Sequence, residues 1–295
     1  MLTKKETGQK IVIWGSGNAF KENIHWIRSR FAILCGVDSN ERNRGVIDGV
    51  RFCSPDVLKD VRPDFVLVVV KWPFYREQIA AEISQISPEM IIKYPEEFRT
   101  RSVKWSEQKG PYSETDDLGN TIFVAEGSFL TNFRITFNGM ENRIDIGQGV
   151  KSGDYCKIRM EGDHNRMIIG DSSTILGMEA FISEAGTVTL GCDCMLSTGI
   201  VFYQEQSHVI FDRESGKRTN GSKNIVLHDH VWLGRNVTCL AGAEIGEGSV
   251  VGYGSVVSKR YGDHQVIAGN PGRVVRENAD WERELAHEDG SGENS

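Results

Sequence analysis

Histidine is the side chain in this sequence best suited to moving a proton near neutral pH, because its ordinary pKa is about 6.5. The chain has seven histidines, and most of them suggest no more than a partly exposed structural role. His208 differs, because it stands at the start of a polar segment that interrupts an otherwise regular pattern. A neutral imidazole at that point could accept a proton from a hydroxyl group.

Two closely spaced pairs raise the question of a metal or redox site. His228 and His230 would point to the same side of a strand, but no third ligand follows at a recognisable spacing, so no metal site is predicted. Cys192 and Cys194 fall inside the regular pattern, where we expect core packing instead of chemistry. None of the six cysteines forms a C-x-x-C pair, and we expect reduced thiols.

The regular pattern is a hexapeptide repeat in the C-terminal half. An α-helix needs a period near 3.6 residues and sandwich strands alternate over longer runs, whereas a period of six means a short strand and a corner. Three such units close one triangular coil, and stacked coils bury the lead residues in a column. Glycine often follows the lead residue, as at Gly234 and Gly246, and we expect it because the corners need unusual dihedrals. The longest run of lead residues is Leu227, Leu233, Cys239, Ile245, Val251 and Val257.

One long insertion breaks the repeat. A coil that starts at the lead residue Leu190 would place the first lead residue of the following coil at position 208, which is His208. The hexapeptide pattern resumes only at Leu227. The insertion, residues 203–222, is polar and non-repetitive. A long loop inside a regular solenoid usually carries function, so we expect the site to lie here.

Residues 1–98 predict a separate, Rossmann-like α/β domain with a parallel sheet. Strands and helices alternate, and the strand at residues 64–70 is continuously apolar after Asp64, as a strand buried on both faces should be. Gly15 and Gly17 form a tight turn after the first strand and Asp38 ends the second, so these three residues are candidate ligand contacts. Phe20 replaces the third glycine of the dinucleotide fingerprint, which argues against NAD chemistry.

Two polar segments flank the repeat. Residues 99–120 are predicted to be a linker, and the acidic, Gly- and Ser-rich residues 279–295 are predicted to be disordered. The β-helix domain would therefore span residues 121–278.

The composition narrows the classes of function. A net charge of −7 and a pI near 5.6 argue against nucleic acid as a partner. The longest apolar run, residues 65–70, is too short to span a bilayer, and the N-terminal residues contain no recognisable signal peptide. We therefore expect a cytoplasmic protein without stable membrane insertion.

Four segments of the repeat domain, within about residues 144–276, resemble the hexapeptide-repeat acyltransferases, which fold as left-handed parallel β-helices. The likeness is closest to the sugar and capsular-polysaccharide O-acetyltransferases. The segments keep the family's order, and they are Ser207-His208-Val209-Ile210, His230-Val231-Trp232-Leu233-Gly234, Gly252-Tyr253-Gly254-Ser255-Val256-Val257-Ser258-Lys259 and Gly269-Asn270-Pro271-Gly272-Arg273-Val274-Val275.

The resemblance implies transfer of an acetyl group from acetyl-CoA to a sugar hydroxyl of a bacterial capsule or O-antigen, or of its precursor. His208 would be the general base that takes the hydroxyl proton, and a backbone N–H would hold the oxyanion. The saccharide acceptor would contact Glu205, Arg218 and Asn220. Trp232 should face outward, because it precedes the lead residue Leu233. Acetyl-CoA would contact Trp232, Tyr253, Ser258, Lys259, Arg273 and Arg276.

Two points follow from the comparison of motifs. Gln206 stands where the family often has Asp, so either a backbone carbonyl or Glu205 would orient His208. In this family the cleft lies between neighbouring β-helices, which implies a homotrimer.

Two other functions stay open at this point. A nucleotide-sugar N-acetyltransferase would hold its nucleotide in the N-terminal domain, but that subgroup usually lacks both the long insertion and the His-Val-Trp-Leu-Gly segment. A non-catalytic β-helix scaffold would have no use for His208, Trp232 and Lys259 together.

Overall fold

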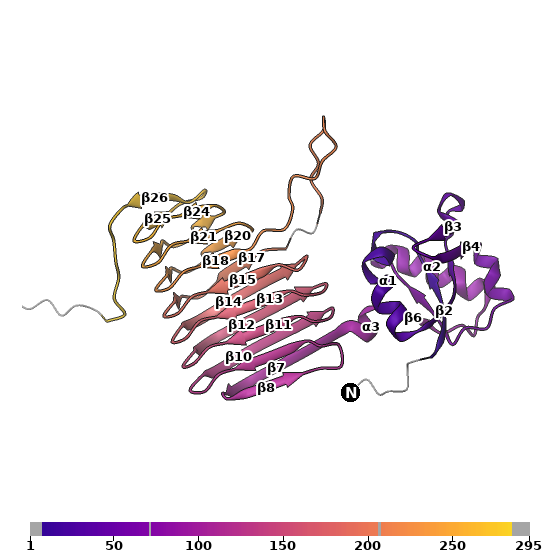
Figure 1. Cartoon of the computed structure of the whole chain (residues 1–295), viewed down its shortest axis with the longest axis horizontal. Coiled ribbons are helices and arrows are strands. Elements are labelled where there is room, and N and C mark those ends of the chain that lie inside the picture. The colour runs from indigo at the N-terminus through magenta and orange to yellow at the C-terminus, as the bar shows by residue number, and fades with distance from the viewer. Residues whose placement is uncertain (1–7, 71, 206–207, 285–295) are drawn as a thin grey trace, which may run out of the picture. The chain divides into compact units, whose positions relative to one another are not determined.

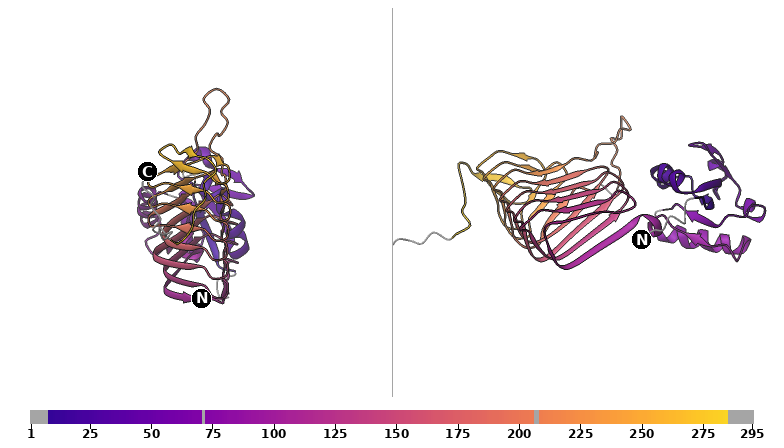
Figure 2. Two further views of the ribbon diagram at one scale, coloured as in Figure 1. Left: turned by 90° about the vertical axis from the view of Figure 1, so that its left-hand side faces the viewer. Right: turned by 60° about the horizontal axis from the view of Figure 1, so that its bottom comes forward.

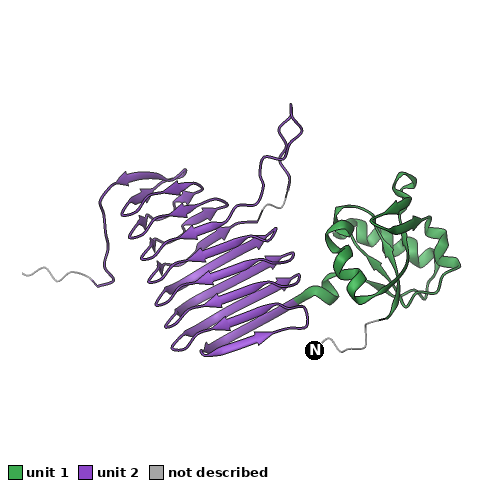
Figure 3. Cartoon of the chain, viewed as in Figure 1, with its two compact units in different colours: residues 1–100 green, residues 101–295 purple. Residues whose placement is uncertain are grey.

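The computed structural model describes residues 8–70, 72–205 and 208–284. The chain divides into two compact units, residues 1–100 and residues 101–295 (Figure 3). Among the described residues, none of the helices has both the length and the apolar composition that a membrane crossing requires.

The first unit is built on a six-stranded sheet with the strand order β3-β4-β2-β1-β5-β6. All its pairs are parallel except that of β3 with β4, and the order turns back at β1, as it does in doubly wound sheets. The internal strand β5 is buried along its whole length, in agreement with its continuous apolar run. The strands are β1 (Lys10–Trp14), β2 (Ala32–Val37), β3 (Gly45–Ile47), β4 (Val50–Cys53), β5 (Phe65–Val68) and β6 (Ile92–Lys93).

Three α-helices and two 3-10 turns complete this unit. The predicted alternation of strands and helices is confirmed, and Ile24 and Ile83 each lie buried in a helix. The β3–β4 hairpin was not predicted, because its short strands show no clear alternation. The helical segments are α1 (Asn18–Arg30), η1 (Glu41–Asn43), η2 (Pro55–Lys59), α2 (Pro73–Ile86) and α3 (Glu96–Arg99).

The second unit is a parallel β-helix whose coils have three walls (Figures 1 and 2). Wall 1 is an eight-stranded sheet. It consists of β8 (Tyr112–Thr115), β9 (Thr121–Val124), β11 (Arg143–Ile146), β13 (Arg166–Ile169), β15 (Thr187–Leu190), β18 (Ile225–Leu227), β21 (Glu244–Ile245) and β24 (Arg260–Tyr261).

Walls 2 and 3 belong to one twelve-stranded sheet, because the long strands of the early coils bend around the corner between them. The first residues of β14 pair with β16 on wall 2, and its later residues pair with β17 on wall 3. The bent strands are β10 (Phe129–Asn138), β12 (Lys151–Glu161) and β14 (Thr174–Ser183). Wall 2 continues with β16 (Met195–Leu196), β19 (Trp232–Leu233), β22 (Val250–Val251), β25 (Val266–Ala268) and β26 (Arg273–Arg276). Wall 3 has β17 (Ile200–Tyr203), β20 (Thr238–Leu240) and β23 (Val256–Val257), and β7 (Thr100–Lys109) lies along the bent strand β10.

The lead residues of the hexads form the buried column that the repeat predicts. Leu190, Leu227 and Ile245 all have side chains with at most 1% exposure, and they belong to one continuous core. Cys194 is also fully buried, which confirms its packing role, and burial raises the pKa of its thiol to about 12. Cys192 is exposed, so the packing prediction was wrong for that residue.

The glycines after the lead residues serve a different purpose from the predicted one. Gly234 and Gly246 have no positive φ, whereas positive φ occurs further along the corners, as at Gly248 and Gly254. A Cβ on Gly246 would collide with the backbone of Gly262 in the next coil, and one on Gly234 would come within 2.9 Å of the Val251 carbonyl oxygen. The lead-residue glycines are therefore required by close approach between coils.

The predicted linker at residues 99–120 is instead a capping layer whose strands run antiparallel to the first coil of the β-helix. β7 pairs with β10, and β8 pairs antiparallel with β9. Val103, Trp105 and Tyr112 pack against the core, and Trp105 lies 6.2 Å from Phe133 between ring centroids. These side chains cover the hydrophobic core at the open end of the stack. Every solenoid needs such a cap, because its terminal repeat has a neighbour on one side only.

The predicted disorder of residues 279–295 is wrong for the part that the structure describes. Residues 277–284, here called the C-terminal strap, follow β26 and lie along the coils. Ala279 and Trp281 are buried, with 9% and 7% exposure, because alternate residues face the β-helix. Residues 285–295 lie outside the described residues.

A ladder of buried asparagines ties the early coils together at the corner between walls 3 and 1. The Asn142 Nδ2 donates to Asn120 Oδ1 at 3.0 Å, and Asn142 Oδ1 accepts from both the backbone N–H and Nδ2 of Asn165 at 2.9 Å. All three side chains have 0% exposure. Buried amides stabilise a fold only when they are fully paired.

Replacing Asn142 with Ala should therefore lower the free energy of unfolding by about 2–4 kcal/mol, since it removes these bonds and leaves the Asn165 N–H unpaired. Urea unfolding followed by circular dichroism would measure the loss. Arg143→Ala is the matched control, because its surface ion pair with Asp145 should contribute no more than about 1 kcal/mol. Equal unfolding midpoints for the two variants would contradict the role of the ladder.

Candidate functional site

His208 lies at the base of the insertion, which leaves the β-helix at the corner between walls 3 and 1 and projects from it (Figure 1). The described part of the insertion forms a hairpin closed by a bridge between Phe211 and Arg218. His208 is exposed. Gln206, which stands where the family often has Asp, lies outside the described residues.

Two of the predicted acceptor contacts are engaged in holding the hairpin. Asn220 Nδ2 donates to the His208 carbonyl oxygen at 2.6 Å, and Asn220 Oδ1 accepts from the Ile210 N–H at 2.8 Å. Arg218 forms an ion pair with Glu184 of the β-helix at 2.7 Å. Glu205 is half-buried, and its backbone N–H donates to the Phe181 carbonyl oxygen at 3.1 Å. Asn220 and Arg218 thus fix the backbone around His208.

Wall 2 presents an outward row that joins two of the predicted cofactor contacts. Trp232 is in register with Val250, Val250 with Val266, and Val266 with Arg276. The Trp232 indole is 37% exposed while Leu233 beside it is fully buried, which confirms the predicted outward direction. At a strand spacing of about 4.8 Å, the row extends about 14 Å from Trp232 to β26, which carries Arg276. The side chains between them are apolar.

The remaining predicted cofactor contacts lie elsewhere on the coil. Arg273 is exposed on β26, close to Arg276. Tyr253 is 73% exposed at the corner between walls 2 and 3, and its hydroxyl accepts from Asn236 Nδ2 at 3.3 Å. Ser258 and Lys259 follow β23 at the corner between walls 3 and 1, where the Lys259 ammonium lies 5.5 Å from the Tyr261 ring centroid.

The predicted residues therefore form two groups within one chain. Trp232 and Arg276 stand on wall 2, whereas His208 and Lys259 stand at the corner opposite that wall. A triangular coil places a wall and its opposite corner on different sides of the core, so one β-helix does not bring the two groups together.

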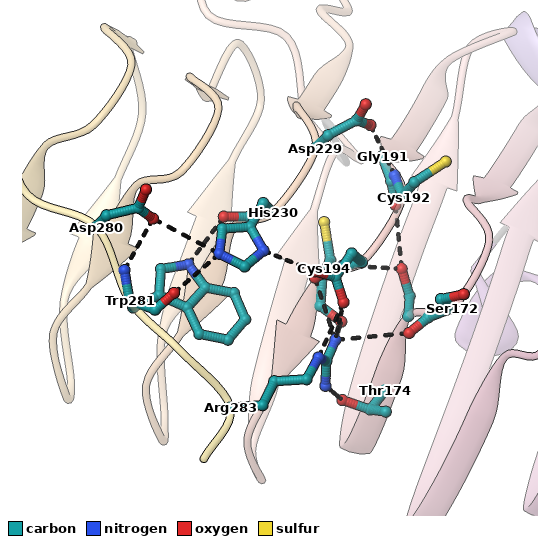
Figure 4. Close-up of polar contacts among 12 residues, drawn as sticks. Ser172, Thr174, Gly191, Cys192, Cys194, Asp229, His230, Asp280, Trp281 and Arg283 are labelled. Atoms are coloured by element: carbon teal, nitrogen blue, oxygen red, sulfur yellow. Dashed lines mark hydrogen bonds and ion pairs between the residues drawn. The ribbon is translucent and has the colours of Figure 1, made fainter. Parts of the chain in front are cut away.

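A third group, which the sequence did not predict, is centred on His230 at the corner between walls 1 and 2 (Figure 4). The His230 ring stacks on Trp281 of the strap, with ring centroids 4.1 Å apart and planes 6° apart. Its Nδ1 bonds to Asp193 Oδ2 at 2.6 Å, and its Nε2 bonds to the Trp281 carbonyl oxygen at 2.9 Å. The Trp281 indole N–H donates in turn to the His230 carbonyl oxygen at 2.9 Å.

Arg283 extends this group along the strap. Its guanidinium donates to Asp193 Oδ1 at 2.9 Å and to Thr174 Oγ1 at 2.8 Å, and it also reaches the Cys194 carbonyl oxygen (Figure 4). The strap is therefore bound to several successive coils through alternate residues.

The electrostatics of the group favour a charged histidine. Both partners of the His230 ring are acceptors, so both nitrogens are satisfied only when the ring carries two protons. Burial acts to lower the pKa of His230, but the hydrogen bonds to Trp281 and Asp193 outweigh it and raise that pKa above its ordinary value. Burial likewise acts to raise the pKa of Asp193, but His230 and Arg283 hold it below its ordinary value.

The other residues considered for chemistry have ordinary partners. His228 Nε2 lies 3.2 Å from Glu244 Oε1, within hydrogen-bond distance, so the two rings of the His228-x-His230 segment contact different neighbours. Within the part of the chain that the structure describes, no group of three or more His, Cys, Asp or Glu side chains could hold a metal ion.

The candidate ligand residues of the first unit form a tight turn. Gly15 has φ +108°, and a Cβ there would approach the Val69 carbonyl oxygen to 2.9 Å. The Asp38 carboxylate accepts from the backbone N–H of Ser16 at 3.2 Å and from its hydroxyl at 2.5 Å. A Cβ on Gly17 would meet nothing within 4 Å. Asp38 thus already has partners in the turn, which weakens the expectation that it contacts a ligand.

The His230 group was missed because its members are far apart in sequence. One signal was present: Trp281 and Arg283 stand two residues apart in an otherwise acidic tail, as side chains on one face of an extended segment do.

Comparison with known proteins gives matches to both units. A protein-family model described as "C2185-like, N-terminal" matches residues 7–92. A polysialic acid O-acetyltransferase of Neisseria meningitidis is 32% identical over 198 residues, which cover 60% of this chain and 91% of that protein. A putative lipopolysaccharide biosynthesis O-acetyl transferase of Escherichia coli K12 is 29% identical over 145 residues, 46% of this chain and 72% of that protein. The crystal structure of the polysialic-acid-specific acetyltransferase NeuO aligns with 32% identity and a TM-score of 0.45, over 58% of this chain and 88% of that one.

The charge state of His230 predicts how the strap responds to pH. Because its pKa is raised on folding, the stabilisation is complete below the unfolded value of about 6.5 and is lost as pH rises through the folded pKa. The pKa of Asp193 is lowered on folding, so its pH dependence has the opposite sign. The stabilisation from Asp193 is present above about pH 3.9 and is lost only in more acidic solution. Limited proteolysis should release residues 277–284 faster at pH 8.5 than at pH 6.

His230→Asn is the matched control, since Asn tolerates the positive φ of 54° at this position but does not titrate. Release of the strap should then be fast at both pH values. A wild-type strap released at the same rate at pH 6 and pH 8.5 would contradict the role of the imidazolium.

Proposed function

We propose, from the premise that this chain belongs to the hexapeptide-repeat acyltransferase family of left-handed β-helix enzymes, that it transfers acetyl groups from acetyl-CoA to a hydroxyl of a bacterial surface polysaccharide. The observation that carries the proposal is the 32% identity to a polysialic acid O-acetyltransferase over 91% of that relative's length. The acceptor is a capsule or O-antigen saccharide or its precursor. The first unit, with its doubly wound strand order, would be Rossmann-like.

His208 is the proposed general base. Its neutral imidazole takes the proton of the acceptor hydroxyl while the oxygen attacks the thioester carbonyl. The tetrahedral intermediate collapses to the acetyl ester, and the departing thiolate receives a proton from the imidazolium. Support comes from the exposure of His208 and from the hydrogen bond by which Asn220 holds its backbone. A backbone N–H would stabilise the oxyanion.

The outward row on wall 2 is the proposed path of the acetyl-CoA arm. Pantetheine is an extended chain with a thioester at one end and phosphates at the other. The row offers the Trp232 indole at one end, Val250 and Val266 between, and the cations Arg273 and Arg276 at the other end. Guanidinium groups suit phosphate oxygens, because they donate two parallel hydrogen bonds. Tyr253 would contact the cofactor through its backbone. Ser258, through its backbone, and Lys259, as a point charge, stand at the corner opposite wall 2 and would reach the cofactor from a neighbouring subunit.

A homotrimer with shared clefts would unite the two groups of residues. His208 and Trp232 stand on opposite sides of one β-helix, so a neighbouring subunit would have to bring its insertion over wall 2. The insertion also carries three consecutive exposed apolar side chains, Val209, Ile210 and Phe211, which suit contact with another protein surface. Three subunits around one axis would form three equivalent clefts.

The role of the base is tested by replacing His208 with Ala. Turnover should fall by about two to four orders of magnitude, while the affinity for acetyl-CoA is unchanged, because the imidazole acts on the acceptor. Acetyl-CoA consumption would be assayed against a panel of oligosaccharides, with the product mass as readout. His164→Asn is the control, an exposed histidine at the same edge of the β-helix, and it should keep full activity. Near-normal turnover of His208→Ala would remove His208 from the mechanism.

The shared cleft is tested by mixing two impaired variants. Light scattering should first give about three times the chain mass of 33.0 kDa. Randomly mixed trimers of His208→Ala and Trp232→Ala subunits should recover up to about a quarter of the wild-type sites, because some clefts then combine an intact histidine with an intact indole. A fully active monomer, or mixed trimers no more active than their parents, would contradict the model.

A further inference from the structure

The strap brings a second indole to the row on wall 2. The ring centroids of Trp281 and Trp232 lie 6.0 Å apart, with planes inclined by 49°, a separation typical of interacting aromatic pairs. Trp281 approaches from the corner between walls 1 and 2, so it lies along one side of the row. Trp281 is the one aromatic residue in the described part of the strap, residues 277–284.

The two indoles differ in how firmly they are held. Trp281 is 7% exposed, and three contacts fix it: the stack on His230, its N–H bond to the His230 carbonyl oxygen, and its own carbonyl bonded to the His230 ring. Trp232 is 37% exposed on a strand of two residues, and its neighbours along the row are Met195 and Val250. Neither neighbour is aromatic, so neither can fix the orientation of the half-exposed indole by stacking against its ring.

We infer that Trp281 is a positioning residue for the acetyl-CoA site, which fixes the Trp232 indole as one side of the groove that receives the cofactor arm. The inference rests on the proposed function. Trp281 is too deeply buried to offer much surface to a ligand, so it acts through Trp232. The β-helix coils alone do not complete this side of the groove, and the strap is part of the binding site.

The geometry also explains why Trp281 is attached at His230. His230 and Trp232 are two residues apart on the same coil, and Val231 between them is fully buried. A ring stacked on His230 therefore meets Trp232 from the side. Asp193 and Arg283 hold the same stretch of strap against the preceding coil.

The test compares steady-state kinetics of the full-length chain and three Trp281 variants, at saturating acceptor. Trp281→Ala and Trp281→Leu should raise the KM for acetyl-CoA about 3- to 10-fold, the value of a lost aromatic pair, while kcat changes by less than about twofold. Trp281→Phe should restore most of the affinity, because a phenyl ring can still stack on His230 and contact Trp232. The KM of the acceptor should stay constant in all three variants.

Trp105→Ala is the matched control, because it removes an indole that packs against the same core at the other end of the stack. It should lower the melting temperature and leave the KM for acetyl-CoA unchanged. If Trp281→Ala does not fold, the contrast between the Leu and Phe variants carries the same information.

Three results would overturn the inference. Equal KM values for wild type and Trp281→Leu would show that Trp232 needs no support, with the proposed function intact. A rise in KM for Trp105→Ala as large as that for Trp281→Leu would reduce the effect to general destabilisation. Failure of the wild-type chain to bind or turn over acetyl-CoA would remove both the inference and the function on which it rests.

Discussion

Hydrogen bonds between successive coils are the constraint on which the rest of the second unit depends. The backbone of each coil is paired with the next, as when the Thr174 N–H bonds to the Cys194 carbonyl and the Met195 N–H bonds to the Val231 carbonyl. A slip of one residue would turn the buried column outward, so the register is strict. Two residue preferences follow from this strict register. Glycine is needed where the backbones of adjacent coils nearly touch, and asparagine is used where a corner needs a buried amide. Only a corner can accept an insertion without breaking this ladder, and the loop with His208 stands at one.

The sequence was sufficient for those parts of the fold that short-range patterns determine. The hexads predicted the coils, the buried column and the outward direction of Trp232, because each of these depends on residues within one turn of the coil. The antiparallel layer before the first coil was mistaken for a linker, since Val103 and Trp105 alternate within a mostly polar stretch and the hexad is absent there. The strap was missed for another reason: Trp281 meets His230, 51 residues earlier, and no local pattern reports such a contact. The role of the lead-residue glycines also became clear only from the neighbouring coil.

The arrangement of the site follows from the shape of a triangular coil. Every wall is nearly flat, so one chain offers rows and edges instead of a deep pocket, and a ligand needs a second surface. The chain places a cationic and apolar row on wall 2 and a projecting histidine at the opposite corner. In the proposed homotrimer each would be half of a cleft, and the two halves would meet through a heterologous interface. The hairpin contacts of Asn220 and Arg218 lower the entropy cost of such a union, because the loop is already folded before it meets a partner.

The direction of the strap has a consequence for how the protein comes apart. A stack of repeats is quasi-one-dimensional, and its last repeats ordinarily fray one at a time, because each touches only its neighbours. The strap runs across that direction: the Ala279 N–H bonds to the His264 carbonyl, Trp281 bonds at His230, and Arg283 bonds as far back as Ser172. The strap thus connects the terminal coil to coils well inside the stack. Opening the end requires several coils to separate together, so the C-terminal half of the solenoid behaves as a single cooperative block.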